Sequence, residues 1–225
     1  MLCPEHGGVF LESGHSMKSR IASSSTSTES TRPVSRGAGE VRIIGGLWRR
    51  TRLSVAERVG LRPTPDRVRE TLFNWLGQSL EGWRCADVFA GTGALGLEAA
   101  SRGAQEVTLC EQDGALAHQL KAHVTRLHAT QVTVQSGDGL QWLRQQAGAQ
   151  WDLIFLDPPF ASALFEPALT AAHRAMRSTG YVYLESPERW SDERLGSLGF
   201  VLHRHLKAGA VHAHLLQAAK PGAVA

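Results

Sequence analysis

The chain has 225 residues, of which 42% are hydrophobic and 20% charged, and its formal net charge is +3 at pH 7. These values suit a globular protein with one α/β core and do not favour a membrane-spanning or a fully disordered class. The sequence shows no run of about 18 apolar residues and no secretory signal, so we expect a cytoplasmic protein that does not enter a membrane.

Residues 1–40 are rich in Ser, Thr and Gly and include the run Ser23–Thr28. Periodic apolar residues are almost absent from this stretch, so it cannot bury enough surface to fold. We therefore predict a disordered N-terminal extension over residues 1–40 and assign it no function.

The following segment, residues 41–80, predicts a basic β-arm and a helix that connects it to the core. β-Branched and basic residues alternate over Val41–Val55, as in a two-stranded ribbon. Pro63–Asp66 then supplies residues typical of a helix start, and apolar residues at helical spacing continue to about Leu80.

This arm and helix also concentrate positive charge. Between Val41 and Trp75, eight arginines stand against three acidic residues, which gives a local net charge of +5. Clustered guanidinium groups gain affinity for phosphates by displacing counterions, and this favours a nucleic-acid partner. A solvated basic surface without a partner explains the charge alone about equally well.

From residue 81 to 218, short strands and helices alternate. Such units predict a Rossmann-like α/β core with a mostly parallel sheet, right-handed crossovers and helices on both faces. Residues 219–225 are expected to form a flexible C-terminus. The predicted strands are Cys85–Ala90, Glu106–Glu111, Gln131–Gln135, Trp151–Leu156 and Gly180–Glu185, and the predicted helices are Ala94–Arg102, Gly114–His128, Gly139–Gln146 and Ala163–Met176.

The last part of the core departs from this alternation of strands and helices. Phe200–Leu206 and Ala210–Ala218 both alternate in polarity, and only three residues separate them. This spacing predicts a hairpin that adds an antiparallel edge to the sheet.

Metal ligands do not form a recognisable set in this sequence. Three cysteines, an odd number without close spacing, argue against a disulfide framework and against a zinc site. Four histidines alternate along the predicted hairpin with no cysteine or acidic ligand beside them: His203, His205, His212 and His214. We therefore predict no metal site and leave the meaning of these histidines open.

The first candidate site is the glycine-rich turn Asp87–Gly96, which follows the first core strand. Its glycines allow the backbone to approach a ligand closely. Glu111 lies twenty residues after Gly91, at the end of the next strand, where an acid accepts hydrogen bonds from ribose hydroxyls. These features predict an adenosine-containing cofactor and do not by themselves distinguish a nicotinamide dinucleotide from S-adenosyl-L-methionine.

The second candidate site is the sequence Asp-Pro-Pro-Phe at Asp157–Phe160, which ends an apolar strand. In an open α/β sheet this loop lies beside the glycine-rich turn. The prolines stiffen the turn, so the Asp157 carboxylate and the Pro158 carbonyl become fixed acceptors and Phe160 offers a stacking face. Two acceptors on one amino group favour a pyramidal nitrogen whose lone pair faces a methyl donor, so we predict positioning of a ring amino group.

Asp138 follows the third core strand, and two interpretations of it remain open. It is placed to contact the adenine ring of the same cofactor, or to cap the helix that follows.

Several segments, taken in order, resemble the RsmD family of bacterial 16S ribosomal RNA guanine-N2 methyltransferases. They are Arg42–Arg49, Leu61–Leu76, the glycine-rich turn and Asp-Pro-Pro-Phe, and the resemblance runs from about Val41 to Leu216. It implies a class I methyltransferase fold with seven strands, S-adenosyl-L-methionine as methyl donor, and N2 of a guanine in 16S rRNA as acceptor. It also implies the 30S subunit or its assembly intermediate as partner, and we expect a monomer.

The resemblance assigns roles residue by residue. The catalytic motif maps onto Asp157, Pro158, Pro159 and Phe160. Cofactor binding maps onto Asp87, Phe89, Ala90, Gly91, Thr92, Gly93, Glu111 and Asp138. RNA binding maps onto Arg42, Arg49, Arg50, Arg52, Arg62, Arg67 and Arg69. Two positions depart from the family pattern: Thr92, where Ser is more usual, and His123, where we expect Asn.

Three other functions are compatible with parts of the sequence. A nicotinamide-dependent oxidoreductase shares the glycine-rich turn and Glu111, but Asp-Pro-Pro-Phe counts against it. A methyltransferase acting on an adenine in DNA or on a glutamine amide in a protein uses similar motifs, and the arginines disfavour the protein substrate. A non-catalytic RNA-binding module requires a vestigial cofactor loop, and nothing in the loop is damaged.

Overall fold

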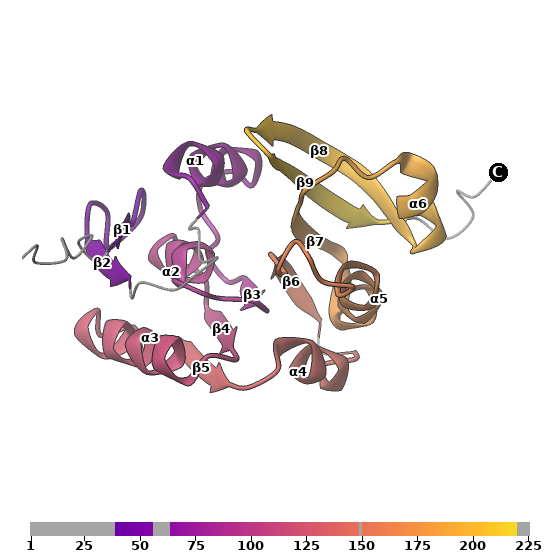
Figure 1. Cartoon of the computed structure of the whole chain (residues 1–225). Coiled ribbons are helices and arrows are strands. Elements are labelled where there is room, and N and C mark those ends of the chain that lie inside the picture. Colours follow the sequence, from indigo (N-terminus) through magenta and orange to yellow (C-terminus); the bar gives the residue numbers. More distant parts are fainter. Residues whose placement is uncertain (1–38, 56–63, 149, 220–225) are drawn as a thin grey trace, which may run out of the picture. The chain divides into compact units, whose positions relative to one another are not determined.

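The computed structural model describes residues 39–55, 64–148 and 150–219. Within these ranges a two-stranded ribbon accompanies a seven-stranded sheet with helices on both faces (Figure 1). The predicted N-terminal extension lies outside the described residues except at its last two positions, and residues 220–225 of the predicted C-terminus lie outside them too.

The predicted ribbon is confirmed. Strand β1 (Gly39–Arg42) pairs antiparallel with β2 (Arg52–Val55), and β1 begins inside the predicted extension. Helix α1 (Asp66–Trp75) follows, and it ends before the predicted Leu80 because Gly77 takes a left-handed φ of +87° directly after the helix cap.

The predicted seven-stranded sheet with an antiparallel C-terminal hairpin is also confirmed. Its strands are β3 (Arg84–Asp87), β4 (Glu106–Glu111), β5 (Val132–Ser136), β6 (Trp151–Leu156), β7 (Met176–Ser186), β8 (Phe200–Ala208) and β9 (Val211–Ala218). They lie in the order β5-β4-β3-β6-β7-β9-β8. The pairs from β5 through to β7 are parallel, and β9 pairs antiparallel with both β7 and β8.

Five further helices complete the described core: α2 (Ala94–Ser101), α3 (Gly114–Arg126), α4 (Gly139–Gln145), α5 (Phe165–Ala175) and α6 (Asp192–Ser197). The first four were predicted to within a few residues. The six-residue helix α6 was missed, although Ser191 is a recognisable N-cap whose side chain accepts a hydrogen bond from the Arg194 N–H.

Two apolar clusters bury the two faces of the sheet. Along β6, Leu153 and Phe155 pack with α1, α2 and the ribbon, whereas Ile154 and Leu156 pack with α4 and α5. Strands that are buried on both faces read as continuous apolar runs, which explains the sequence of β6. None of the helices within the described ranges is both long and apolar enough to cross a membrane.

The strand order reverses between β3 and β6. The chain moves outward from β3 to β5 and then returns to place β6 on the other side of β3. In open α/β sheets a ligand crevice forms at the carboxyl ends of the strands at such a reversal. The turns after β3 and β6, which carry the two candidate sites, therefore flank the same crevice.

Candidate active site

The glycine-rich turn begins where β3 ends, at Asp87, three residues before the predicted end of that strand. Gly91 and Gly93 adopt left-handed φ values of +51° and +77°, which only glycine takes at little cost. The buried Asp87 carboxylate accepts a hydrogen bond from the Gly96 N–H at 2.9 Å. Burial raises the pKa of Asp87 to about 7, and the Gly96 hydrogen bond partly opposes this shift. Asp87 therefore fixes the turn against the first residues of α2.

Glu111, at the end of β4, fixes the same turn from the neighbouring strand. Its two carboxylate oxygens accept hydrogen bonds from the N–H groups of Gly91 and Asp113, each at 2.7 Å. An ionised carboxylate has about four lone-pair sites, so Glu111 keeps capacity for ribose hydroxyls.

Asp138 caps α4: its side chain accepts a hydrogen bond from the Gln141 N–H at 3.0 Å. The capping interpretation is thus confirmed, and the adenine contact stays a prediction. Asp138 also borders a pocket of about 250 Å³, together with Cys110 and Trp142 among others. The next residue, Gly139, lies so close to the Val88 carbonyl that a Cβ would come within 1.9 Å of its oxygen. The pocket therefore lies directly beside the glycine-rich turn, and its walls and Glu111 fit an adenosine.

The Asp-Pro-Pro-Phe turn follows β6. Asp157 is partly buried, Pro158 is buried, and Pro159 and Phe160 are exposed, with 39% of Phe160 accessible to solvent. Burial raises the pKa of Asp157 well above its usual range, and the negative charges of Glu185 and Asp87 raise it further. The turn thus presents an open aromatic face next to a carboxyl group that binds a proton readily.

Glu185 is a site residue that the sequence interpretation missed. Leu184 pairs with Leu156 across β7 and β6, so Glu185, the next-to-last residue of β7, lies level with Asp157, which directly follows β6. Glu185 is only 3% exposed. An acid that ends an apolar strand beside the Asp-Pro-Pro-Phe strand was the available signal.

The arm is fixed to the core through Glu98 of α2, a second residue that the sequence interpretation missed. The fully buried Glu98 carboxylate accepts hydrogen bonds from the N–H groups of Ile44 at 2.7 Å and Gly45 at 2.8 Å. It also pairs with Arg102 at 2.8 Å and with Arg69 at 3.4 Å. One buried acid therefore joins the loop of the ribbon, α1 and α2.

Helix α3 holds the other strand of the ribbon. His123 Nε2 lies 2.9 Å from the Ser54 carbonyl oxygen, and Arg126 donates to the Arg52 carbonyl at 2.7 Å. Burial lowers the pKa of His123, so the neutral imidazole donates this hydrogen bond. His123, which stands where Asn was expected, therefore forms a packing contact between α3 and the arm.

The arginines predicted to bind RNA do not all lie on the surface. Arg69 is 1% exposed, pairs with Glu98 and Asp66, and donates to the carbonyls of Arg42 and Thr64. The prediction that Arg69 contacts RNA is therefore wrong, because its guanidinium group is used inside the protein. Arg62 lies outside the described residues. The exposed members of the set are Arg42, Arg49, Arg50, Arg52 and Arg67.

The histidines of the C-terminal hairpin support the fold. His214 is fully buried; its Nε2 accepts from the Trp190 N–H at 3.2 Å, and its Nδ1 lies 3.4 Å from the Leu184 carbonyl oxygen. Burial lowers the pKa of His214 to about 4, so the ring is neutral at pH 7. No cluster of three or more potential metal ligands occurs within the part of the chain that the structure describes.

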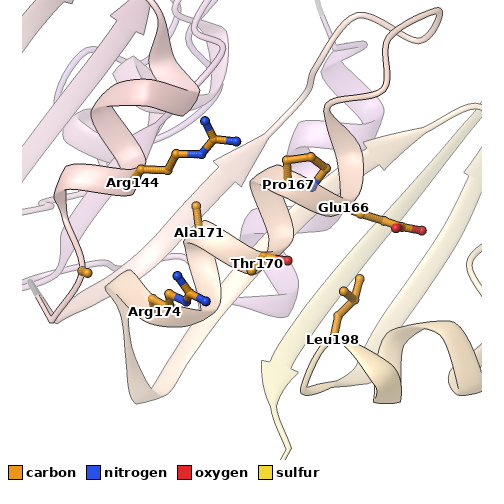
Figure 2. Close-up of a pocket in the computed structure, with 8 residues that line it drawn as sticks. Arg144, Glu166, Pro167, Thr170, Ala171, Arg174 and Leu198 are labelled. Atoms are coloured by element: carbon orange, nitrogen blue, oxygen red, sulfur yellow. The ribbon is translucent and has the colours of Figure 1, made fainter.

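A larger pocket, of about 510 Å³, lies between α4 and α5 and is separate from both candidate sites. Figure 2 shows Arg144 on α4 and Arg174 on α5 at its border, with Glu166 and Leu198 on other sides. None of the predicted catalytic or cofactor-binding residues lines it, so we assign it no part in the chemistry.

Proteins similar in sequence to this chain include ribosomal RNA methyltransferases. The profile of the family described as Conserved hypothetical protein 95 matches residues 41–217. Ribosomal RNA small subunit methyltransferase D of Escherichia coli strain K12 is 39% identical over 197 residues, which cover 83% of this chain and 94% of that protein. The Haemophilus influenzae protein of the same name is 41% identical over 179 residues, covering 74% of this chain and 93% of that protein.

The fold is also found in a solved structure. The Escherichia coli protein yhhF superposes with a TM-score of 0.71 at 38% sequence identity. The match covers 80% of this chain and 99% of that protein.

Proposed function

This chain belongs to the Conserved hypothetical protein 95 family, the RsmD family, and we propose that it methylates N2 of a guanine in 16S rRNA with S-adenosyl-L-methionine. The observation that carries this proposal is the position of two turns at one reversal of strand order. The glycine-rich turn after β3 and Asp-Pro-Pro-Phe after β6 end neighbouring parallel strands. A methyl donor in one turn and an amino group in the other would therefore meet.

S-adenosyl-L-methionine supplies the methyl group, which is carried on a positively charged sulfur. We assign its ribose to Glu111 and its adenine ring to the pocket beside Asp138. The backbone of the turn would enclose the rest of the cofactor, and the residues concerned are Asp87, Phe89, Ala90, Gly91, Thr92 and Gly93. The carboxylates of Asp87 and Asp157 complement a positively charged donor.

The target amino group is held by the Asp-Pro-Pro-Phe turn in this proposal. The Asp157 carboxylate and the Pro158 carbonyl accept one N–H each, so the nitrogen lone pair is directed at the methyl group. The exposed ring of Phe160 stacks on the base, and Pro159 keeps the turn rigid. Positioning of the nucleophile supplies most of the catalysis.

The arm supplies RNA affinity in this proposal. Its exposed arginines, Arg42, Arg49, Arg50, Arg52 and Arg67, bind phosphates of 16S rRNA in the 30S subunit or its assembly intermediate. We further propose that the protein acts in the cytoplasm as a monomer. Residues 41–80 would serve as the RNA-binding arm with its linking helix, and residues 81–218 as the methyltransferase domain.

The test is transfer of labelled methyl from S-adenosyl-L-methionine to 30S particles that lack their own guanine-N2 modification. Nucleoside analysis of the product should give labelled N2-methylguanosine. Labelled N6-methyladenosine would change the acceptor to adenine. Absence of label from RNA, while the protein binds a nicotinamide dinucleotide, would replace the proposal with an oxidoreductase.

A further inference from the structure

The crevice contains a pair of acids on neighbouring strands, and only one of them belongs to the Asp-Pro-Pro-Phe turn. Asp157 follows β6 and Glu185 lies near the end of β7, at equivalent levels of a parallel pair. Glu185 is buried and Asp157 is partly buried. Neighbouring carboxylates repel each other when both are ionised, so each raises the affinity of the other for a proton.

The surroundings of the two acids differ. The Tyr183 hydroxyl donates a hydrogen bond to Glu185 at 2.8 Å, and the Thr64 side chain donates a second one. Among the described residues, no group donates a hydrogen bond to the Asp157 carboxylate. Donors stabilise the ionised form of a carboxylate, so Glu185 keeps its negative charge, and Asp157 is the member of the pair that takes up a proton when one becomes available.

We propose that Glu185 is a positioning residue that makes Asp157 the acceptor of the proton that the guanine amino group loses during methylation. This inference rests on the proposed function. It adds Glu185, Tyr183 and Thr64 to the residues that support the reaction, although none of the three needs to touch the substrate.

Methylation of N2 forms one bond to nitrogen and releases one proton from it. When N2 bonds to the methyl carbon, the bond from that carbon to sulfur breaks and its electron pair stays on sulfur. One N–H bond of N2 then breaks, its electron pair stays on nitrogen, and the proton bonds to a carboxylate oxygen of Asp157.

The charges around Asp157 explain why it accepts this proton. Burial is the largest cause that raises the pKa of Asp157; Glu185 from β7 is the next and Asp87 from β3 the third. A carboxylate with a raised pKa is the better proton acceptor, because acceptors work best when their pKa lies near the working pH.

The decisive experiment compares the pH dependence of single-turnover methyl transfer to 30S particles in the wild type and in Glu185→Gln. Glutamine keeps a side-chain oxygen for the Tyr183 and Thr64 donors but removes the negative charge. Loss of a neighbouring like charge lowers the pKa of Asp157. We expect the acidic limb of the profile to move to lower pH by about one unit or more, with a reduced maximal rate.

Two further variants make this test independent of folding defects. Tyr183→Phe removes one hydrogen-bond donor to Glu185 but keeps the carboxyl group. Glu185 is then ionised in a smaller fraction of the molecules, so the acidic limb should shift in the same direction by less. Glu188→Gln makes the same chemical change at a glutamate that is 66% exposed and paired with Arg194, and its profile should match the wild type. Thermal melts check that each variant is folded.

The outcomes separate this inference from the proposed function. A downward shift of the limb in Glu185→Gln and Tyr183→Phe, but not in Glu188→Gln, supports the inference. Slower turnover with an unshifted limb in both test variants shows that Glu185 only stabilises the fold and overturns it. If Glu185→Gln does not fold, the acidic limb of the pH profile of Tyr183→Phe decides whether the inference holds. A wild type that transfers no methyl at any pH overturns the function and the inference together.

Discussion

Asp157 owes its chemical character to the residues around it. Burial and two nearby acids raise its pKa, whereas the two prolines that follow hold the turn rigid and Phe160 exposes a ring. An isolated aspartate in water would be ionised and weakly basic at neutral pH. The surroundings of Asp157 thus disfavour its ionised form, as is common at sites where a group must exchange a proton.

Replacing Asp157 by Ala should lower the methyl-transfer rate by about 100-fold or more, because both an acceptor for N2 and the proton acceptor are lost. The dissociation constant for S-adenosyl-L-methionine, measured by calorimetry, should change only a few-fold. Asp192→Ala, at an exposed aspartate of α6, is the matched control and should keep wild-type activity. Turnover of Asp157→Ala within a few-fold of the wild type would contradict the proposed mechanism.

The site residues that the sequence revealed lie in short local motifs, whereas those that it did not reveal have hydrogen-bond partners distant in the sequence. Asp157 and Glu111 stand in or near short motifs with fixed spacing, so their positions follow from the sequence. Glu185 and Glu98 each have a partner far away along the chain: Thr64 bonds to Glu185, and Glu98 bonds to Ile44, 54 residues before it. Arg69 was misassigned for the same reason, since nothing local reveals that its partner is a buried acid.

The arm and the helices around it form one bonded unit. Glu98 is fully buried between Arg69 and Arg102 and accepts two backbone N–H groups of the ribbon loop. Removing one member of a buried ionic network is costly because it leaves the remaining charges uncompensated. The buried network around Glu98 therefore holds the exposed arginines of the arm in a fixed arrangement.

Glu98→Gln should lower the free energy of unfolding by about 3 kcal/mol or more, because Arg69 and Arg102 lose their buried counter-charge. Denaturant melts give the change in stability, and hydrogen exchange should show faster exchange of the Ile44 and Gly45 amides. Glu81→Gln, at an exposed glutamate, is the control and should leave both measurements nearly unchanged. Unaltered amide protection in Glu98→Gln would mean that other contacts hold the arm.

For the helices and strands, the sequence predicted the type of each element well and its boundaries less well. Periodicity identified every strand of the sheet, because central strands are buried on both faces and the hairpin alternates. Helix α1 ends early at a left-handed glycine, and β3 ends early because Glu111 and Asp87 accept hydrogen bonds from backbone N–H groups of the turn after it. These endings depend on tertiary contacts, which a periodic pattern does not contain.

At the scale of the molecule, a cluster of exposed arginines and a cluster of buried or partly buried acids lie on different elements of the described chain. Exposed arginines lie on the arm and α1, whereas Asp87, Asp157 and Glu185 gather at the carboxyl ends of the central strands. A basic surface attracts the RNA backbone at long range, and the acidic crevice receives a positively charged donor and an amino group. This separation lets one small protein bind a polyanion and still favour a cation at its centre.

Changing Arg49 and Arg50 together to Ala should weaken binding to 30S particles, because two phosphate contacts are lost. The slope of log K against log salt concentration should fall in magnitude by roughly 1 to 2. Arg144→Ala with Arg174→Ala removes two arginines from the pocket of Figure 2 and is the matched control; its slope should equal that of the wild type. An equal loss of affinity in both double variants would show that only total charge matters.

The contacts that hold the arm also constrain the order in which the protein can mature during its own synthesis. The ribbon is made first, but Glu98, His123 and Arg126, which bind it, emerge from the ribosome only after many more residues have been added. Domains fold as units during translation, so the arm reaches its final arrangement only once α3 is complete. A nascent chain therefore lacks the ordered basic surface until α3 has emerged from a particle that is itself rich in RNA.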